Sequence, residues 1–169
     1  IGAQALELGE QLLALAEREP DPAVLALAHF TLGATLFSSG ISLPRAREHL
    51  EQAIRRYDRE CDDRSRRFLT ALNVFDLGVN ARAWLANVLW ILGYFDRALR
   101  RSRQALELAQ QLDHFLSQVL ALYAAAHAHQ ARGEDRALGD LVQALDQLVR
   151  GKNLLVGEVW VAVFGGWLM

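Results

Sequence analysis

Residues 85–105 read LANVLWILGYFDRALRRSRQA, a pattern typical of two short helices joined by a tight turn. The apolar first half carries the small residue Ala86, Gly93 interrupts it, and alanines follow at positions 98 and 105. Alanines seven residues apart lie on one face of a helix, and their small side chains let another backbone come close. The stretch therefore predicts an antiparallel helix pair.

The same arrangement recurs along the chain. Small residues within apolar segments stand at positions 33, 86, 126 and 166, the last three spaced by 40 residues. The first three of these segments run into glycine turns at Gly40, Gly93 and Gly133. A helix–turn–helix unit repeated at this period is typical of an α-solenoid. We therefore expect an all-α fold, a right-handed α-solenoid of about eight helices in antiparallel pairs.

Composition agrees with this fold and excludes several classes of protein. The chain has 169 residues, of which 52% are hydrophobic, and its net charge of −2 lacks the positive excess that nucleic-acid binding requires. The single cysteine, Cys61, cannot form an internal disulfide, which predicts a reducing, cytoplasmic location. The apolar stretch 154–169 contains Glu158 and three glycines, and it is shorter than the ~20 residues that span a bilayer.

Hydrophobic periodicity divides the single domain 1–169 into successive segments. They are predicted as 1–18 (second helix of a preceding repeat), 22–57, 77–112 and 115–150 (repeats) and 154–169 (first helix of a truncated repeat). In the first segment, the predicted inward stripe consists of Ala5, Leu8, Leu12 and Leu15. Because the chain begins without Met and stops within an apolar segment, we expect it to be a piece of a longer protein.

A charged run over residues 58–67 separates the first two repeats. We expect it to form an exposed loop, followed by a short helix over 68–73. Cys61 lies in this run and is expected to be solvated, with neighbouring arginines lowering its pKa. A charge run is usually a solvated surface, and docking of a partner is the alternative interpretation.

Two of the repeats resemble the tetratricopeptide pattern. The matching residues are Leu32-Gly33 with Ala46, Leu50 and Ala53, and Leu85-Ala86 with Gly93-Tyr94-Phe95, Ala98 and Ala105. The third repeat departs from the pattern, because Leu138 and Leu145 stand where alanines are expected. A register slip to Ala137 and Ala144 is therefore an open alternative.

The resemblance extends to a bacterial subfamily of such repeats. The stretches that carry it are QLLALA (11–16), LGATLF (32–37), AREHLEQA (46–53), LGYFDRAL (92–99) and the closing Gly166-Trp167. They are similar to the helical-repeat region that follows a cyclase or kinase domain and an ATPase module in large signalling proteins, including multidomain adenylate cyclases. The resemblance implies a regulatory role. The chain has no phosphate-binding loop, since Gly151-Lys152 lacks the upstream glycine and the following hydroxyl.

In tetratricopeptide domains the first helix of each pair lines a concave groove that holds a partner. On this resemblance, the predicted partner-binding residues are Phe30, Phe37, Asn80, Trp84, Asn87, Trp90, Tyr123, His127, Gln130, Trp160 and Phe164. The aromatic side chains supply contact area, and Asn80 and Asn87 resemble asparagines that hold a peptide backbone. The alternative is that the aromatic residues pack between repeats.

No catalytic, metal or cofactor site is predicted. His127 and His129 project about 200° apart on a helix and cannot chelate together, and His114 lies before that helix. We therefore expect a non-catalytic interaction and regulatory scaffold. Its partner would be a protein, a peptide or another domain of the parent chain, with self-association through its ends as a further expectation, and without nucleic acid or membrane. A domain that senses a small molecule is the alternative.

Overall fold

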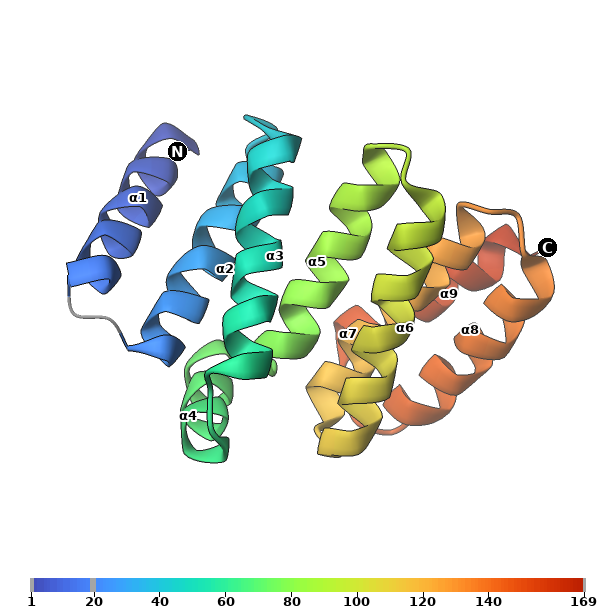
Figure 1. The fold of residues 1–169 in the computed structure, drawn as a ribbon. Helices are drawn as coiled ribbons and strands as arrows, with labels where there is room; N and C mark the ends of the chain where they lie inside the picture. Colours follow the sequence, from blue (N-terminus) through green and yellow to red (C-terminus); the bar gives the residue numbers. More distant parts are fainter. Residues whose placement is uncertain (1, 19–20, 169) are drawn as a thin grey trace.

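The computed structural model describes residues 2–18 and 21–168, and within these ranges the chain forms nine α-helices and no strand (Figure 1). The helices are α1 (Gly2–Arg18), α2 (Pro22–Ser38), α3 (Leu43–Arg59), α4 (Asp63–Asn73), α5 (Leu77–Ile91), α6 (Phe95–Leu112), α7 (Phe115–Gln130), α8 (Asp135–Val149) and α9 (Leu155–Trp167). The predicted all-α stack of helix pairs is confirmed, with one helix more than expected. Ile1, Pro20 and Met169 lie outside the described residues. None of the described helices is long and apolar enough to cross a bilayer.

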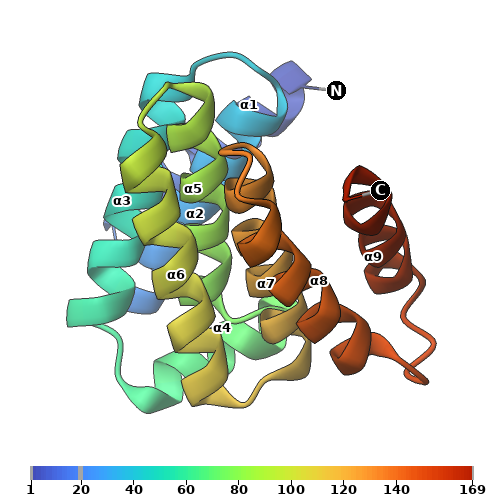
Figure 2. The same ribbon diagram turned by 90° about the vertical axis from the view of Figure 1, so that its right-hand side faces the viewer.

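The stack has two layers. Helices α3, α6 and α8 form the front layer in Figure 1, and α2, α5, α7 and α9 lie behind them. Each front helix packs between two helices of the rear layer: α3 on α2 and α5, α6 on α5 and α7, and α8 on α7 and α9. Helix α9 stands out from the stack on the side away from α3 and α6 (Figure 2). The rear layer therefore forms a continuous face with α9 as a projecting wall.

The glycine turns and the points where paired helices cross lie at the positions that the sequence predicts. Gly93 has a φ of +83° and Gly133 a φ of +67°, a conformation that a side chain disfavours. The alanines of the first two repeats are buried where helices meet, as are Leu138 and Leu145 of the third. Ala144 is exposed, so the alternative register is excluded.

The predicted loop over residues 58–67 is wrong. Helix α3 continues to Arg59, and α4 begins at Asp63 after Asp62, whose carboxylate accepts a hydrogen bond from the Ser65 amide at 2.8 Å. The many charged residues obscured the amphipathic pattern of α4, which packs against the core through the fully buried Leu69. Cys61 is only 6% exposed, and burial raises the pKa of its thiol, contrary to expectation.

The predicted inward stripe of α1 is correct only at Leu12, which packs against the cluster of Ala16, Leu25 and Ala28. Leu8 and Leu15 are 65% and 62% exposed, whereas Gly9 and Ala16 are buried against α2. A Cβ on Gly9 would lie 3.2 Å from Cδ1 of Leu32, so the two helices approach through the small residues. The same face carries Leu6, Leu12 and Leu13, which are partly buried against the core on either side of the small residues.

The packing of Tyr57 between α3 and the start of α5 explains why Gly78 stands within a helix. Tyr57 is buried, and its hydroxyl donates to Oδ2 of Asp76 at 2.6 Å. The Tyr57 ring lies over Gly78, where an added Cβ would come within 2.4 Å of the ring. The glycine provides the space that the ring occupies.

A histidine pair joins α2 and α3. The Nδ1 atoms of His29 and His49 are 3.0 Å apart, so one ring donates a hydrogen bond to the other while at least one is neutral. Burial, the adjacent His49 and the nearby Arg56 and Arg55 together lower the pKa of His29 to about 4, and burial is the largest cause. The folded protein therefore holds His29 neutral at a pH where the unfolded chain protonates it.

We expect Gly78→Ala to destabilise the fold by about 1–3 kcal/mol, because the new methyl group must displace the rigid Tyr57 ring. The matched control is Gly139→Ala, also within a helix, where an added Cβ meets only Leu168 Cδ1 at 3.8 Å. That change should stabilise by about 0.5–1 kcal/mol. Urea unfolding measures both. Equal effects of the two substitutions would contradict the packing described for Tyr57.

We expect stability to fall as pH drops from about 6.5, the pKa of histidine in an unfolded chain, to the folded value of about 4. Above that window His29 is neutral in both states, and within it the unfolded state binds more protons. The contribution is about 1–3 kcal/mol, measured as the difference in unfolding free energy between wild type and His29→Gln across the window. Parallel pH profiles for the two proteins would disprove it.

Candidate functional site

A cavity of about 430 Å³ opens on the rear layer between α2, α5, α7 and α9. It is lined by Phe37, Ala83, Trp84, Asn87, Trp90, Ile91, Leu120, Tyr123, His127 and Trp160. Seven of the eleven residues that the sequence predicts for a partner groove are among these. We refer to it as the aromatic cavity.

Its walls are rings that contact one another across successive helices. The Phe37 ring of α2 meets Trp84 of α5 edge-on, with centroids 5.2 Å apart. The Trp90 ring of α5 meets His127 of α7 at 5.3 Å, again edge to face. Tyr123 of α7 stacks on Trp160 of α9 at 4.2 Å. The aromatic contacts therefore join all four helices of the rear layer and hold the cavity's shape.

Three polar groups in this wall have no protein partner. Nε1 of Trp90 is buried without a hydrogen bond. Within the described ranges, the side chains of Asn87 and His127 also make no hydrogen bond, although neither residue is fully exposed. Burial lowers the pKa of His127, so its ring is neutral near pH 7. An apolar cavity with uncommitted amide and imidazole groups suits a ligand that brings its own donors and acceptors.

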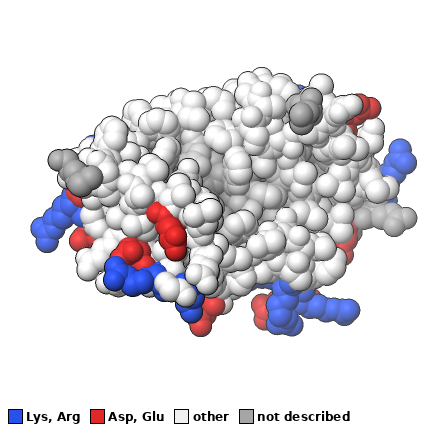
Figure 3. Space-filling model, turned by 180° about the vertical axis from the view of Figure 1, so that it is seen from behind, with Lys and Arg blue, Asp and Glu red and all other residues white. Residues whose placement is uncertain are grey.

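The face around the cavity carries little charge. Figure 3 shows the rear of the molecule, where the hollow at its middle is white. Most Lys, Arg, Asp and Glu atoms lie toward the edges, and one acidic side chain stands on the face to the left of the hollow. No charged side chain lines the aromatic cavity. A charged ligand group placed there would lose its hydration without gaining an opposite charge.

Four predicted groove residues lie elsewhere. Phe30 lines a separate cavity beside Trp84, and Asn80 is buried on α5. Gln130 is half-buried at the end of α7 and does not line the aromatic cavity. Phe164 is buried beneath Tyr123, with ring centroids 5.8 Å apart. For Phe164, the alternative interpretation of packing between repeats is therefore correct.

Sequence reasoning missed Ile91, which lines the aromatic cavity and is 51% exposed. It lies four residues after Asn87 and seven after Trp84, so helical spacing alone would have placed it on the same face. Ala83 and Leu120 also line the cavity and were not predicted.

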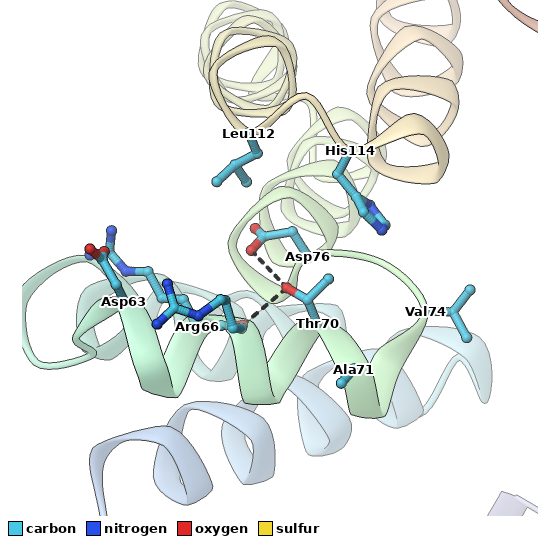
Figure 4. A pocket seen from close by; sticks show the side chains of 9 residues that line it. Asp63, Arg66, Thr70, Ala71, Val74, Asp76, Leu112 and His114 are labelled. Carbon is cyan, nitrogen blue, oxygen red and sulfur yellow. Dashed lines mark hydrogen bonds between the residues drawn. The ribbon is translucent and has the colours of Figure 1, made fainter.

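A second cavity, of about 600 Å³, lies beside α4, of which sequence analysis expected only the part over 68–73. We refer to it as the α4 cavity. Its lining consists of Asp63, Arg66, Arg67, Thr70, Ala71, Val74, Asp76, Leu112 and His114. Figure 4 shows Leu112 and His114 reaching from the α6–α7 turn toward α4, with Asp76 and Thr70 between them.

Hydrogen bonds fix the polar floor of the α4 cavity. Asp76 accepts from Tyr57 and Thr70 through Oδ2 and from the Val79 amide through Oδ1, and its own amide donates to Oγ of Ser117 at 2.8 Å. Ser117 in turn lies 2.9 Å from Nδ1 of His114. This serine–histidine contact resembles a nucleophile with its base, but Ser117 is fully buried. The pair caps α7 instead, since the Ser117 amide also points at the His114 ring.

The histidines of α7 have separate roles. His129 Nδ1 lies 2.5 Å from Oε2 of Glu134, whereas His127 lines the aromatic cavity. Within the described ranges, no three His, Cys, Asp or Glu side chains gather as a metal site would require.

Comparison of the chain with protein-family models and with curated proteins finds no match. The tetratricopeptide resemblance therefore stays a prediction, while the stack of helix pairs is observed directly.

Two substitutions of Trp90 distinguish the stability that comes from packing of its ring from the effect of its unpaired N–H group. Trp90→Ala removes the contact with His127 and should destabilise by about 2–4 kcal/mol. Trp90→Phe keeps an aromatic ring and removes the buried donor, so we expect a change below about 1 kcal/mol. Chemical denaturation of both variants measures this. A loss for Trp90→Phe as large as for Trp90→Ala would mean that the N–H group has a partner.

Proposed function

We propose that this chain is a non-catalytic interaction domain that binds an uncharged, apolar segment of a protein or peptide in the aromatic cavity. The proposal rests on one observation: the lining of the aromatic cavity combines aromatic side chains with unpaired polar groups and includes no charged side chain. Its partner is a separate polypeptide or another part of a longer signalling protein, as the repeat motifs imply.

The size of the aromatic cavity supports a side-chain anchor. A volume of about 430 Å³ lies within the range of ~300–1,000 Å³ found for ligand pockets, and it is large enough for one or two big apolar side chains. Trp and Tyr dominate the energetics of protein interfaces because each buries much surface with few rotatable bonds. The wall contains three tryptophans and a tyrosine.

The unpaired polar groups support recognition of a polypeptide main chain. A peptide bond offers one donor and one acceptor, and the Asn87 amide can pair with both. The neutral His127 ring adds a further donor and acceptor. A ligand that matches them would satisfy groups that the protein itself leaves unpaired.

The exposure of Ile91 supports the interpretation that the aromatic cavity is a binding surface and that its residues do more than pack between repeats. A half-exposed isoleucine next to aromatic rings adds an apolar surface that no described residue covers. Single exposed apolar residues are common, but contiguous apolar surface is typical of interaction sites. The wall of the cavity is formed by two groups of contacting rings, Phe37 with Trp84 and Trp90 with His127, Tyr123 and Trp160, which line the same cavity.

The test is selection of peptides from a displayed random library, followed by affinity measurement with the Ile91→Glu variant. A carboxylate at position 91 should weaken binding at least about tenfold, because its hydration is lost on contact with an apolar ligand. Phe68→Glu is the matched control, since Phe68 is 54% exposed on α4 and lines neither cavity. It should change affinity less than twofold.

Two results would refute the proposal. One is selection of peptides that bind wild type and Ile91→Glu equally well. The other is selection of acidic or basic peptides whose binding falls with salt, because the aromatic cavity holds no charge to attract them.

A further inference from the structure

The α4 cavity is a site of different chemistry from the aromatic cavity. Its α4 wall consists of residues 63, 66, 67, 70 and 71, which share one face of that helix, and of Val74, which follows its last residue. The opposite wall comes from Leu112 and His114 at the α6–α7 turn (Figure 4). Apolar side chains and charged groups therefore both line the α4 cavity of about 600 Å³.

Most polar groups of this cavity are already committed to the fold. Both carboxylate oxygens of Asp76 accept hydrogen bonds from the protein. The Arg66 guanidinium donates to the carbonyl oxygens of Tyr57 and Asp58 at 3.2 and 3.4 Å, and lies 4.9 Å from the centre of the Tyr57 ring. These groups hold the floor in place and leave little capacity for a ligand.

Besides Nε of Arg66, which is buried without a hydrogen-bond partner, two donors remain free. Arg67 makes no hydrogen bond or ion pair with any described residue. His114 accepts at Nδ1 from the Ser117 amide, so in its neutral form the proton resides on Nε2, which has no partner within the described ranges. The cavity therefore offers a guanidinium and an imidazole N–H group to an incoming acceptor.

The acidic residues argue against a cation as the ligand. Asp76 is buried and its oxygens are occupied, which leaves Asp63 as the one free carboxylate in the lining. A single carboxylate does not hold a metal ion, and the free donors outnumber it. Ala71, Val74 and Leu112 supply the apolar part of the wall, and Val74 and Leu112 are both exposed.

The connection between α4 and α5 is strained at this cavity. Val74 has a φ of +66° and a ψ of −33°, which is costly for a β-branched residue. Such strain persists where surrounding contacts impose it, and it is common at binding sites. Here it brings Val74 into the lining of the cavity.

From these observations we propose that the α4 cavity binds a small organic carboxylate with an apolar body. Arg67 contributes the charge that pairs with the carboxylate, His114 contributes a hydrogen-bond donor, and Val74 and Leu112 contact the body of the ligand. This site is independent of the aromatic cavity, and it gives the chain a place to sense a metabolite while the concave face binds a partner.

The experiment uses ¹⁵N-labelled protein titrated with a panel of arylalkyl and alkyl carboxylates, including 4-phenylbutyrate and hexanoate, each beside its carboxamide. We expect the carboxylates to shift the amide resonances of Thr70, Ala71, Val74 and His114. Each carboxamide should bind at least about tenfold more weakly, because a charge-assisted hydrogen bond is lost. This comparison needs no variant.

Arg67→Gln tests the assigned residue, with Arg64→Gln as the matched control on the same helix, since Arg64 is exposed and does not line the cavity. Arg67→Gln should weaken carboxylate binding about tenfold and Arg64→Gln less than twofold. The proposal is overturned if no carboxylate in the panel shifts residues 70–74. Carboxamides that bind as well as carboxylates, or equal effects of the two substitutions, overturn it too. Shifts confined to Trp84, Asn87 and Trp90 would assign the panel to the aromatic cavity instead.

Discussion

The hydrogen bonds of Asp76 are the constraint on which the rest of the structure depends. Its carboxylate caps α5 and accepts from Tyr57 of α3 and Thr70 of α4, while its amide donates to Ser117 of α7. A buried carboxylate is costly unless its oxygens are paired, so these helices must meet at one point. Burial and the adjacent carboxylate raise the pKa of Tyr57, which keeps its hydroxyl protonated and able to donate. The point of contact lies in the floor of the α4 cavity and fixes α5 against α7, the two central helices of the aromatic cavity.

The two cavities differ because different parts of the repeat build them. The aromatic cavity arises from the regular stacking of rear-layer helices, where side chains of one type recur at helical spacing and charges are kept to the outer faces. The α4 cavity arises where the repeat is interrupted, because an extra helix is inserted between α3 and α5 and faces the α6–α7 turn across an open space. Regular stacking produces an apolar face, whereas this insertion produces a partly polar pocket. A chain with both has room for a polypeptide and a small ligand at separate places.

Repeats with strong local signals were predictable to within a residue. The repeat expected over 77–112 is α5 and α6, which begin at Leu77 and end at Leu112, and the repeat expected over 115–150 is α7 and α8, which begin at Phe115 and end at Val149. Helix α4 was expected only over 68–73. Four of its first five residues are charged, and they masked a pattern in which Leu69 is the one fully buried leucine of the helix. For α1 the pattern was ambiguous, since Leu8 and Leu15 are as apolar as the residues that face α2. Hydrophobic periodicity identifies a helix but does not choose between two apolar stripes.

The sequence alone determined the helical pairs, their turns and which helix of each pair carries the aromatic residues, because these follow from local spacing and backbone preference. It did not determine which of those residues share a cavity. Trp160 and Phe164 lie one turn apart on α9, yet Trp160 lines the aromatic cavity and Phe164 is buried beneath Tyr123. That difference depends on where α9 sits against α7 and α8, and packing between helices sets this position rather than the local sequence of α9. The α4 cavity likewise exists only in the folded chain, since its walls are brought together from three separate segments.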